Sequence, residues 1–427
     1  MNRIRLAFVS IMMLIALHAS AQLTIGTQIR PRAEFRNGFK TLTINDRNPA
    51  VFIEQRSRLF ANYNTEKFEV KINFQDVRIW GSTNQVYKTE TGTLTNIYEA
   101  WGRYRFNPNW SFKIGRMDLD YDNARFLGNL DWAAQGRSHD ALVFTYQTDS
   151  ADFRMDIGGA FNQYGTEPAK LAETYYLGVN NYKTMQFIWL HQDLDAASFS
   201  ALIHNDGRQV AADSSMAYRQ TYGLVAKGTL NRIGWNAEAY YQGGENVGGG
   251  KLSAFLLSAS LTVPTSVTPV TVGFDMLSGT SIGDTKDQSF NPLYGTNHKF
   301  YGYMDYFYVG NAHGQTVTSG LVDYYIKSKF KFSDRSSLLG HLHIFKSAAD
   351  LYDLDDLTTS VSPYLGTELD LVLNYSLDKD VNLNLGYSQM FAGESMELVK
   401  STPGDHNAIN NWVWFMINFN PKVLVNK

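Results

Sequence analysis

The feature that most constrains this chain is an alternation of apolar and polar side chains with a period of two. Between Ile25 and Phe35 the odd positions carry Ile, Thr, Pro, Ala and Phe, and the even positions carry Gly, Gln, Arg and Glu. The pattern recurs in FEVKINFQ (68–75) and LGTELDLVLNY (365–375). Successive side chains of a β-strand point to opposite faces of a sheet, so this period predicts strands with one apolar and one charged face.

The same reading applied to the whole chain predicts 18 strands. Their ranges are 23–36, 51–64, 67–80, 94–106, 109–117, 139–147, 152–162, 182–193, 197–205, 217–229, 232–243, 250–263, 268–279, 319–332, 335–346, 363–376, 380–391 and 410–419.

The segments between these strands alternate in length. Short turns such as 63–67 and 106–109 alternate with long polar stretches near 37–50, 81–93, 118–138, 163–181, 206–216, 280–318, 347–362 and 392–409. Short turns on one rim and long loops on the other are typical of a transmembrane up-and-down barrel. We therefore predict an all-β fold, a transmembrane antiparallel β-barrel of about 18 strands with short periplasmic turns and long outer loops.

A soluble all-β protein is the competing interpretation. A propeller would repeat similar blades roughly every 40–50 residues, and the sequence has no such repeat. The net charge of -3 offers no basic surface for nucleic acid, and the absence of cysteine excludes disulfides and thiolate metal sites.

The first residues, MNRIRLAFVSIMMLIALHASA, predict a secretory signal peptide. Arg3 and Arg5 precede an apolar run from Leu6 to Leu17, and Ala19-Ser20-Ala21 has the small residues of a cleavage site. The predicted organisation is a signal peptide over 1–21 and a single outer-membrane barrel domain over 22–427.

The charged face of each strand should line the barrel interior. This places Arg30, Arg32, Arg56, Arg58 and Arg103 inside, and the first four strands carry eight inward cations against four inward carboxylates. Later strands add Glu238, Glu368 and Asp370 at about mid-height. Guanidinium groups stay charged and bind carboxylates bidentately, so the pattern favours anions.

Four segments carry a resemblance to a known family. They are FQDVRIWG (74–81), GRMDLDYDNARFLGNLDWAAQGRSHDAL (115–142), EAYYQGG (238–244) and SFNPLYGTNHKFYGYMDYFYVGN (289–311). The chain resembles the alginate export family of outer-membrane barrels, in the form found in Bacteroidetes-type bacteria. That resemblance implies a monomeric 18-stranded porin-like barrel whose arginine-rich constriction passes an anionic polysaccharide outward.

The second of these segments leaves from the outer rim and returns to it. We expect it to fold into the lumen, where Arg116, Arg125, Asp131, Arg137 and Asp140 would narrow the pore. The alternative is an outer loop with solvated charges. The aromatic stretch within 280–318 is expected to pack over or into the mouth of the barrel.

No metal, cofactor or catalytic site is predicted. Asp118-x-Asp120-x-Asp122 starts like a calcium loop, but Asn123 stands at the glycine position. His341 and His343 share a strand face, and two histidines without further ligands suggest polar lumen residues. Ser138, His139 and Asp140 are adjacent, yet adjacency in sequence does not make a triad.

The predicted function is passive passage of anionic or polar solutes through a porin-like channel, with a non-transporting surface barrel (an adhesin or structural protein) as the alternative. The predicted location is the outer membrane of a Gram-negative bacterium. The predicted partners are membrane lipid, an anionic polysaccharide or small anionic solute, and periplasmic export proteins.

Overall fold

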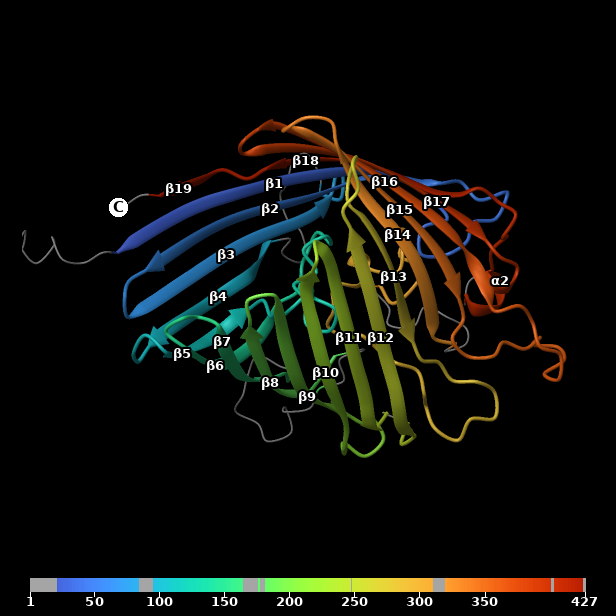
Figure 1. The fold of residues 1–427 in the computed structure, drawn as a ribbon, viewed down its shortest axis with the longest axis horizontal. Helices are drawn as coiled ribbons and strands as arrows, with labels where there is room; N and C mark the ends of the chain where they lie inside the picture. The colour runs from blue at the N-terminus through green and yellow to red at the C-terminus, as the bar shows by residue number, and fades with distance from the viewer. Residues whose placement is uncertain are drawn as a thin grey trace, which may run out of the picture.

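A computed structural model describes residues 21–83, 95–163, 176, 181–246, 248–309, 319–400 and 403–424. In these residues the strands form one antiparallel sheet that closes on itself, so the predicted 18-stranded barrel is confirmed (Figure 1). Residues 1–20 lie outside the described residues, and the signal peptide stays a prediction.

The strands are β1 (Gln22–Asn37), β2 (Ala50–Asn64), β3 (Phe68–Ile79), β4 (Thr95–Arg105), β5 (Trp110–Met117), β6 (His139–Gln147), β7 (Phe153–Phe161), β8 (Thr184–Asp193), β9 (Ala197–Gln209), β10 (Met216–Leu230), β11 (Ile233–Glu245), β12 (Lys251–Val263), β13 (Val270–Leu277), β14 (Leu321–Lys331), β15 (Ser336–Lys346), β16 (Tyr364–Asp378), β17 (Val381–Ala392), β18 (Asn410–Phe419) and β19 (Lys422–Leu424). A 3-10 turn, η2 (Asn297–Lys299), and a short helix, α2 (Ser395–Val399), lie between strands.

Each strand from β1 to β17 pairs with the next in sequence, and β1 closes the barrel against β18, with Ala33 opposite Phe415. After Pro421 the chain continues as β19, which also pairs with β1. The largest difference from the predicted ranges is β9, which extends to Gln209 because its polar end still pairs with both β8 and β10.

The two faces of the wall have the burial expected of a membrane barrel. On β3 the apolar Val70, Ile72 and Phe74 are 41–46% exposed, whereas the polar Asn73 and Gln75 are each only 5% exposed. An apolar outer surface and a buried polar inner surface suit a sheet that faces lipid. No helix among the described residues is both long and apolar enough to cross a membrane.

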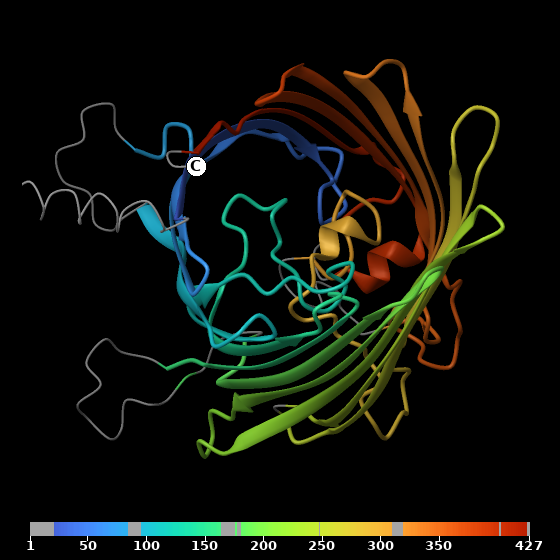
Figure 2. The ribbon, with the colours of Figure 1, turned by 60° about the vertical axis from the view of Figure 1, so that its left-hand side comes forward.

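Two loops fill much of the lumen (Figure 2). We call residues 118–138 the first inward loop and residues 280–309 the second inward loop. They touch through a bridge between Leu127 and Tyr294, and Phe126, Tyr301 and Phe307 are fully buried. The expected packing of the aromatic stretch into the barrel is therefore observed, and its residues 310–318 lie outside the described residues.

Candidate functional site

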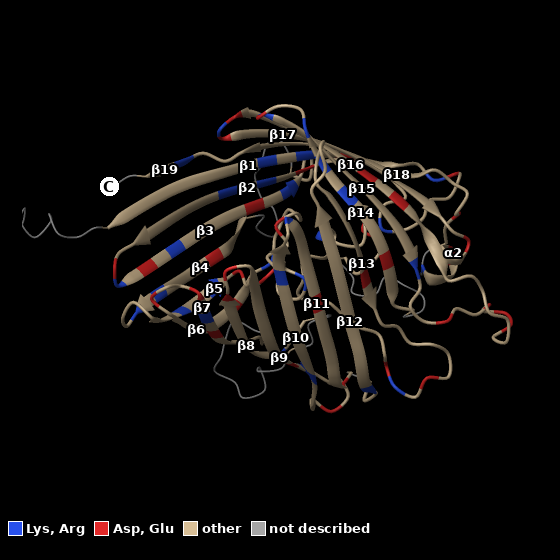
Figure 3. Ribbon diagram, viewed as in Figure 1, with Lys and Arg blue, Asp and Glu red and all other residues tan. Residues whose placement is uncertain are grey.

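Four arginines form a basic stripe on the inner face of β1 and β2, where Figure 3 shows blue bands. We call Arg30, Arg32, Arg56 and Arg58 the arginine ladder; their side chains are at most 8% exposed. Arg30 lies directly opposite Arg56 across the strand pair. Like charges in opposed positions destabilise a strand pair, so the ladder requires acceptors from elsewhere.

The first inward loop supplies these acceptors through its backbone. Arg30 donates to the carbonyl oxygens of Asp131 (2.8 Å) and Trp132 (3.0 Å). Arg32 also donates to the Trp132 carbonyl (3.0 Å), and Arg56 to the Asp131 carbonyl (3.0 Å). The loop therefore lies inside the barrel against β1 and β2, as its sequence predicted (Figure 2).

The carboxylate of Asp131 sits among three guanidinium groups. It lies 2.8 Å from Arg56, 3.0 Å from Arg58 and 3.8 Å from Arg30. Burial opposes ionisation of this carboxyl, but Arg56, followed by Arg30 and Arg58, outweighs burial and lowers its pKa below the usual value. Asp131 is thus an ionised internal counterion of the ladder, with half of its side chain exposed.

The ladder retains excess positive charge after this pairing. In the part of the chain that the structure describes, its four guanidinium groups and that of Arg36 pair with three carboxylates, from Glu34, Glu54 and Asp131. Five positive charges against three negative ones leave an excess of two. The wall formed by β1 and β2 is therefore electropositive at the level of the loop.

Trp132 joins the two inward loops at the ladder. The guanidinium of Arg32 lies over its indole ring, 4.4 Å from the centroid, and the imidazole of His298 stacks on it, also at 4.4 Å. This role of Trp132 was not predicted from the sequence, because its partner His298 is 166 positions away.

The segment 129–137 lines two cavities. The outer cavity, about 840 Å³, is lined by Leu130, Gln135 and Arg137 among others. The inner cavity, about 600 Å³, is lined by Asn129 and Asp131 together with ladder residues Arg56 and Arg58. Segment 129–137 lines both cavities and lies against the ladder; we call this segment together with the ladder the barrier, and it is the candidate site.

Arg137 holds the outer side of this barrier. It donates to the carbonyl oxygens of Gly128 (3.3 Å) and Gly295 (2.8 Å), and so ties the two inward loops together. Burial lowers its pKa to about 10, which leaves the guanidinium charged at neutral pH. Arg137 thus combines a structural role with a positive charge at the outer cavity.

Arg125 and Glu238 do not line an open passage, in contrast to the sequence prediction. Arg125 donates to both oxygens of Asp275 (2.9 Å each), and its Nε lies 3.3 Å from Glu238. Its guanidinium also covers the ring of Phe300 at 3.7 Å. All three charged groups are buried, so they anchor the first inward loop to β11 and β13.

Glu368 and Asp370 are likewise covered. Glu368 accepts from the backbone amide of Met304 (2.8 Å), and Asp370 from that of Tyr303 (3.3 Å). Both carboxylates are at most 1% exposed. They hold the second inward loop against β16. The sequence prediction missed this role, because the loop residues that contact these carboxylates are distant from them in sequence.

The remaining predicted pore residues lie away from the barrier. Arg103 is paired with Glu69 (3.2 Å), near the periplasmic end of β4. Arg116 and Asp140 are paired with each other (3.0 Å), with side chains 42% and 58% exposed. They border the outer cavity at the rim rather than narrowing the lumen as predicted.

Ser138, His139 and Asp140 have separate partners. The Ser138 hydroxyl donates to the Tyr98 carbonyl (2.5 Å), and His139 Nδ1 lies 2.8 Å from the Tyr182 hydroxyl. Asp140 accepts a hydrogen bond from Arg116. This arrangement does not align a nucleophile with a base and an orienting acid.

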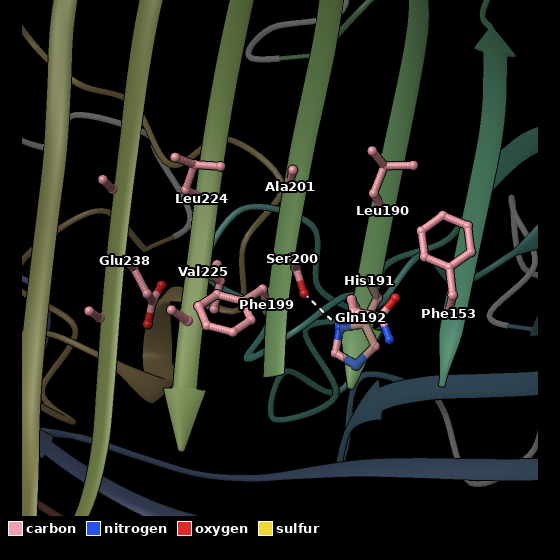
Figure 4. Close-up of a pocket in the computed structure, with 13 residues that line it drawn as sticks. Phe153, Leu190, His191, Gln192, Phe199, Ser200, Ala201, Leu224, Val225 and Glu238 are labelled. Atoms are coloured by element: carbon pink, nitrogen blue, oxygen red, sulfur yellow. Dashed lines mark hydrogen bonds between the residues drawn. The ribbon is translucent and has the colours of Figure 1, made fainter. Parts of the chain in front are cut away.

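A further hollow, about 470 Å³, lies on the outer face of β7–β11 (Figure 4). It arises where the small Ala201, Ala226 and Ala237 stand beside larger residues such as Leu190 and Leu224. His191 and Ser200, which hydrogen-bond each other at 2.7 Å, belong to the opposite, inner face. Its apolar outer lining suits lipid chains and is separate from the barrier.

Comparison with known proteins gives one family and one fold. A family model described as alginate export matches residues 21–406. The chain is similar to OccK9 (OpdG) of Pseudomonas aeruginosa, with 10% identity and a TM-score of 0.63 over 95% of this chain and 99% of that chain. It is also similar to OccK2 (OpdF) of Pseudomonas aeruginosa, solved in complex with glucuronate, with 12% identity and a TM-score of 0.61 over the same shares, 95% and 99%.

A BenF-like porin from Pseudomonas fluorescens Pf-5 has 12% identity and a TM-score of 0.62, again over 95% of this chain and 99% of that chain. No curated protein matches the sequence. At these identities the solved structures establish the barrel fold.

Proposed function

The chain belongs to the alginate export family, and from this premise we propose that it is a porin-like outer-membrane channel for acidic solutes, with the arginine ladder as its selective element. The observation that carries the proposal is the excess of two positive charges on the wall beside the segment that lines both cavities. A buried stripe of guanidinium groups in a pore attracts anions and repels cations.

The ladder suits carboxylates in particular. A guanidinium group donates two parallel hydrogen bonds to a carboxylate, and this geometry distinguishes it from the point charge of lysine. Each uronate unit of an acidic polysaccharide carries one carboxylate. The solved complex of OccK2 with glucuronate supports the choice of uronates as the first solutes to test.

We propose that passage involves movement of the first inward loop, because segment 129–137 lines both cavities. We propose that an acidic solute competes with Asp131 for Arg56 and Arg58. The solute carboxylate then replaces the internal counterion, so the loop is released without leaving the guanidinium groups unpaired. This exchange lowers the free-energy cost of passage for anions and not for neutral sugars.

The test is solute flux into vesicles that contain the purified barrel. Oligomers of glucuronate should enter faster than neutral oligosaccharides of equal length. Arg58→Gln should reduce this preference while the hydrogen bonds from Arg30 and Arg32 to the loop carbonyls stay in place, because the hydrogen bonds of Arg58 go to the Asp131 carboxylate and Gln75. Lys379→Gln is the matched control, since it removes one positive charge from an exposed turn.

Equal entry of charged and neutral oligomers, or a preference unchanged by Arg58→Gln, would contradict the proposal. The filled lumen favours one alternative, a non-transporting surface barrel. Absence of flux for every solute would support that alternative. A transport role, rather than an enzymatic one, agrees with the family, while periplasmic export partners and a monomeric state remain predictions.

A further inference from the structure

A second cluster of chemically reactive groups lies on the inner face of β15 and β16. It contains His341 and His343 on β15 and Asp370 on β16, and His341 is directly opposite Asp370 in the strand register. One nitrogen or oxygen atom from each residue lies within 4.8 Å of the others. All three residues are buried, at 7%, 1% and 1% exposure.

The two imidazoles have nitrogen atoms without hydrogen-bond partners. His343 Nδ1 lies 2.8 Å from an oxygen of Asp323, within hydrogen-bond distance. Among the described residues, the Nε2 of His343 has no hydrogen-bond partner and lies 3.9 Å from Asp370. Within the same residues His341 Nδ1 is also buried without a partner. A buried polar atom without a partner is costly, unless a bound group uses its lone pair.

The charge around the cluster is unbalanced. The buried carboxylates of Asp323, Glu368 and Asp370 face one cation, Lys327, which lies opposite His341 in the register. One oxygen of Glu368 has no hydrogen-bond partner. Three carboxyl groups against one lysine make the cluster acidic, and a divalent cation would offset the repulsion between carboxylates that ionise together.

We propose that His341, His343 and Asp370 bind one zinc ion, with Asp323 orienting His343 from behind. Two imidazoles and one carboxylate form a ligand set that zinc accepts, with a fourth position for water. Calcium and magnesium prefer oxygen ligands, so the two imidazoles select against them. Asp323 would be the outer carboxylate that commonly hydrogen-bonds a metal-ligating histidine, here His343.

This site lies where the second inward loop docks. Asp370 accepts from the Tyr303 amide, and the neighbouring Glu368 accepts from the Met304 amide. A metal ion bound to Asp370 would fix this carboxylate and stabilise the docked loop. The sequence alone indicated only two polar lumen histidines, because Asp370 and Asp323 come from other strands.

The test is zinc binding to the purified, chelator-treated full-length barrel, measured by calorimetry. Absorption spectroscopy of the Co²⁺-substituted barrel reports the coordination. We expect one zinc ion per barrel and a cobalt spectrum typical of four-coordinate nitrogen and oxygen ligands. His343→Gln and Asp370→Asn should abolish binding at zinc concentrations that saturate the wild type. Asp323→Asn should weaken it by roughly 10–100-fold, the usual loss for an outer-shell partner.

His406→Gln is the matched control. His406 forms a partly exposed group with Glu397 and Asp405, and its Nδ1 already contacts Glu397 at 2.7 Å. Loss of zinc in His406→Gln but not in His343→Gln would overturn the proposal, and so would absence of zinc binding by the wild type. Heat-dependent gel mobility should verify that each variant is folded, and Asp323→Asn keeps the proposal testable if a ligand variant does not fold.

Discussion

Replacing Asp131 with Asn tests the link between the arginine ladder and the first inward loop. The substitution keeps the shape of the side chain and removes its charge. It therefore breaks the ion pairs of the carboxylate with Arg56 (2.8 Å) and Arg58 (3.0 Å). The hydrogen bonds from Arg30 and Arg32 to the loop carbonyls remain, so the loop should be loosened rather than unfolded.

The expected size of the effect follows from these two ion pairs. A hydrogen bond to a charged group contributes about 1.5–3 kcal/mol, and exposure of half of the Asp131 side chain reduces this to about 1 kcal/mol each. Two such interactions give about 2 kcal/mol, or about a 30-fold shift of the docking equilibrium toward the released loop. One additional positive charge at roughly 7 Å in water attracts an anion by about 0.6 kcal/mol, or about threefold in local concentration.

The assay is single-channel recording in planar bilayers under a KCl gradient. Asp131→Asn should show more frequent open states and a reversal potential shifted toward that of chloride. Asp120→Asn is the control, because it removes one charge from the same loop at a carboxylate that accepts from Asn129 (3.2 Å) rather than from the ladder. Recordings of Asp131→Asn that match the wild type, or an equal change in Asp120→Asn, would refute the reasoning.

Three further predictions concern the two inward loops and Lys400, which follows α2 and donates to the carbonyl of Tyr306 in the second inward loop. Arg125→Met should lower the free energy of unfolding of the barrel by about 3–5 kcal/mol, because it leaves buried Asp275 and Glu238 without their cation. In a heat-dependent gel-mobility assay, Arg125→Met combined with Asp275→Asn should recover part of this loss. Gly295→Ala should raise the conductance, since a methyl group there overlaps the carbonyl oxygen of Arg125 and separates the loops; an unchanged conductance would show that the loops do not set it. Burial, with a contribution from Lys40, lowers the pKa of Lys400 from 10.5 to about 7. Between these pH values the unfolded chain holds more protons than the folded one, so the stability should rise with pH. Lys400→Met should remove this part of the rise in thermal midpoints measured from pH 7 to pH 10.

Much of the fold was predictable because its signal is local. Each of the eighteen predicted ranges overlaps one observed strand, and β6 and β18 match at both ends. The inward position of the first inward loop was also predictable, since a dense set of Arg, Asp and Asn between two lipid-facing strands requires polar partners. The ladder residues Arg30, Arg32, Arg56 and Arg58 follow from the same alternation.

The roles of the other charged residues were not predictable, because their partners are distant in sequence. Arg125 and Asp275 are 150 positions apart, and the amide of Met304 binds a carboxylate 64 positions away. Local periodicity places such residues on the inner face but cannot show whether solvent or another loop covers them.

The sequence by itself determined the barrel, its strand number and the basic character of one wall, because side-chain alternation and loop length act over a few residues. Only the tertiary structure decided which inward charges remain at the passage and which are anchors for the loops. Closing the sheet brings β1, β2 and the first inward loop together, and β14, β15 and β16 with the second. These contacts between strands and loops decide which charged side chains are paired and which remain in excess.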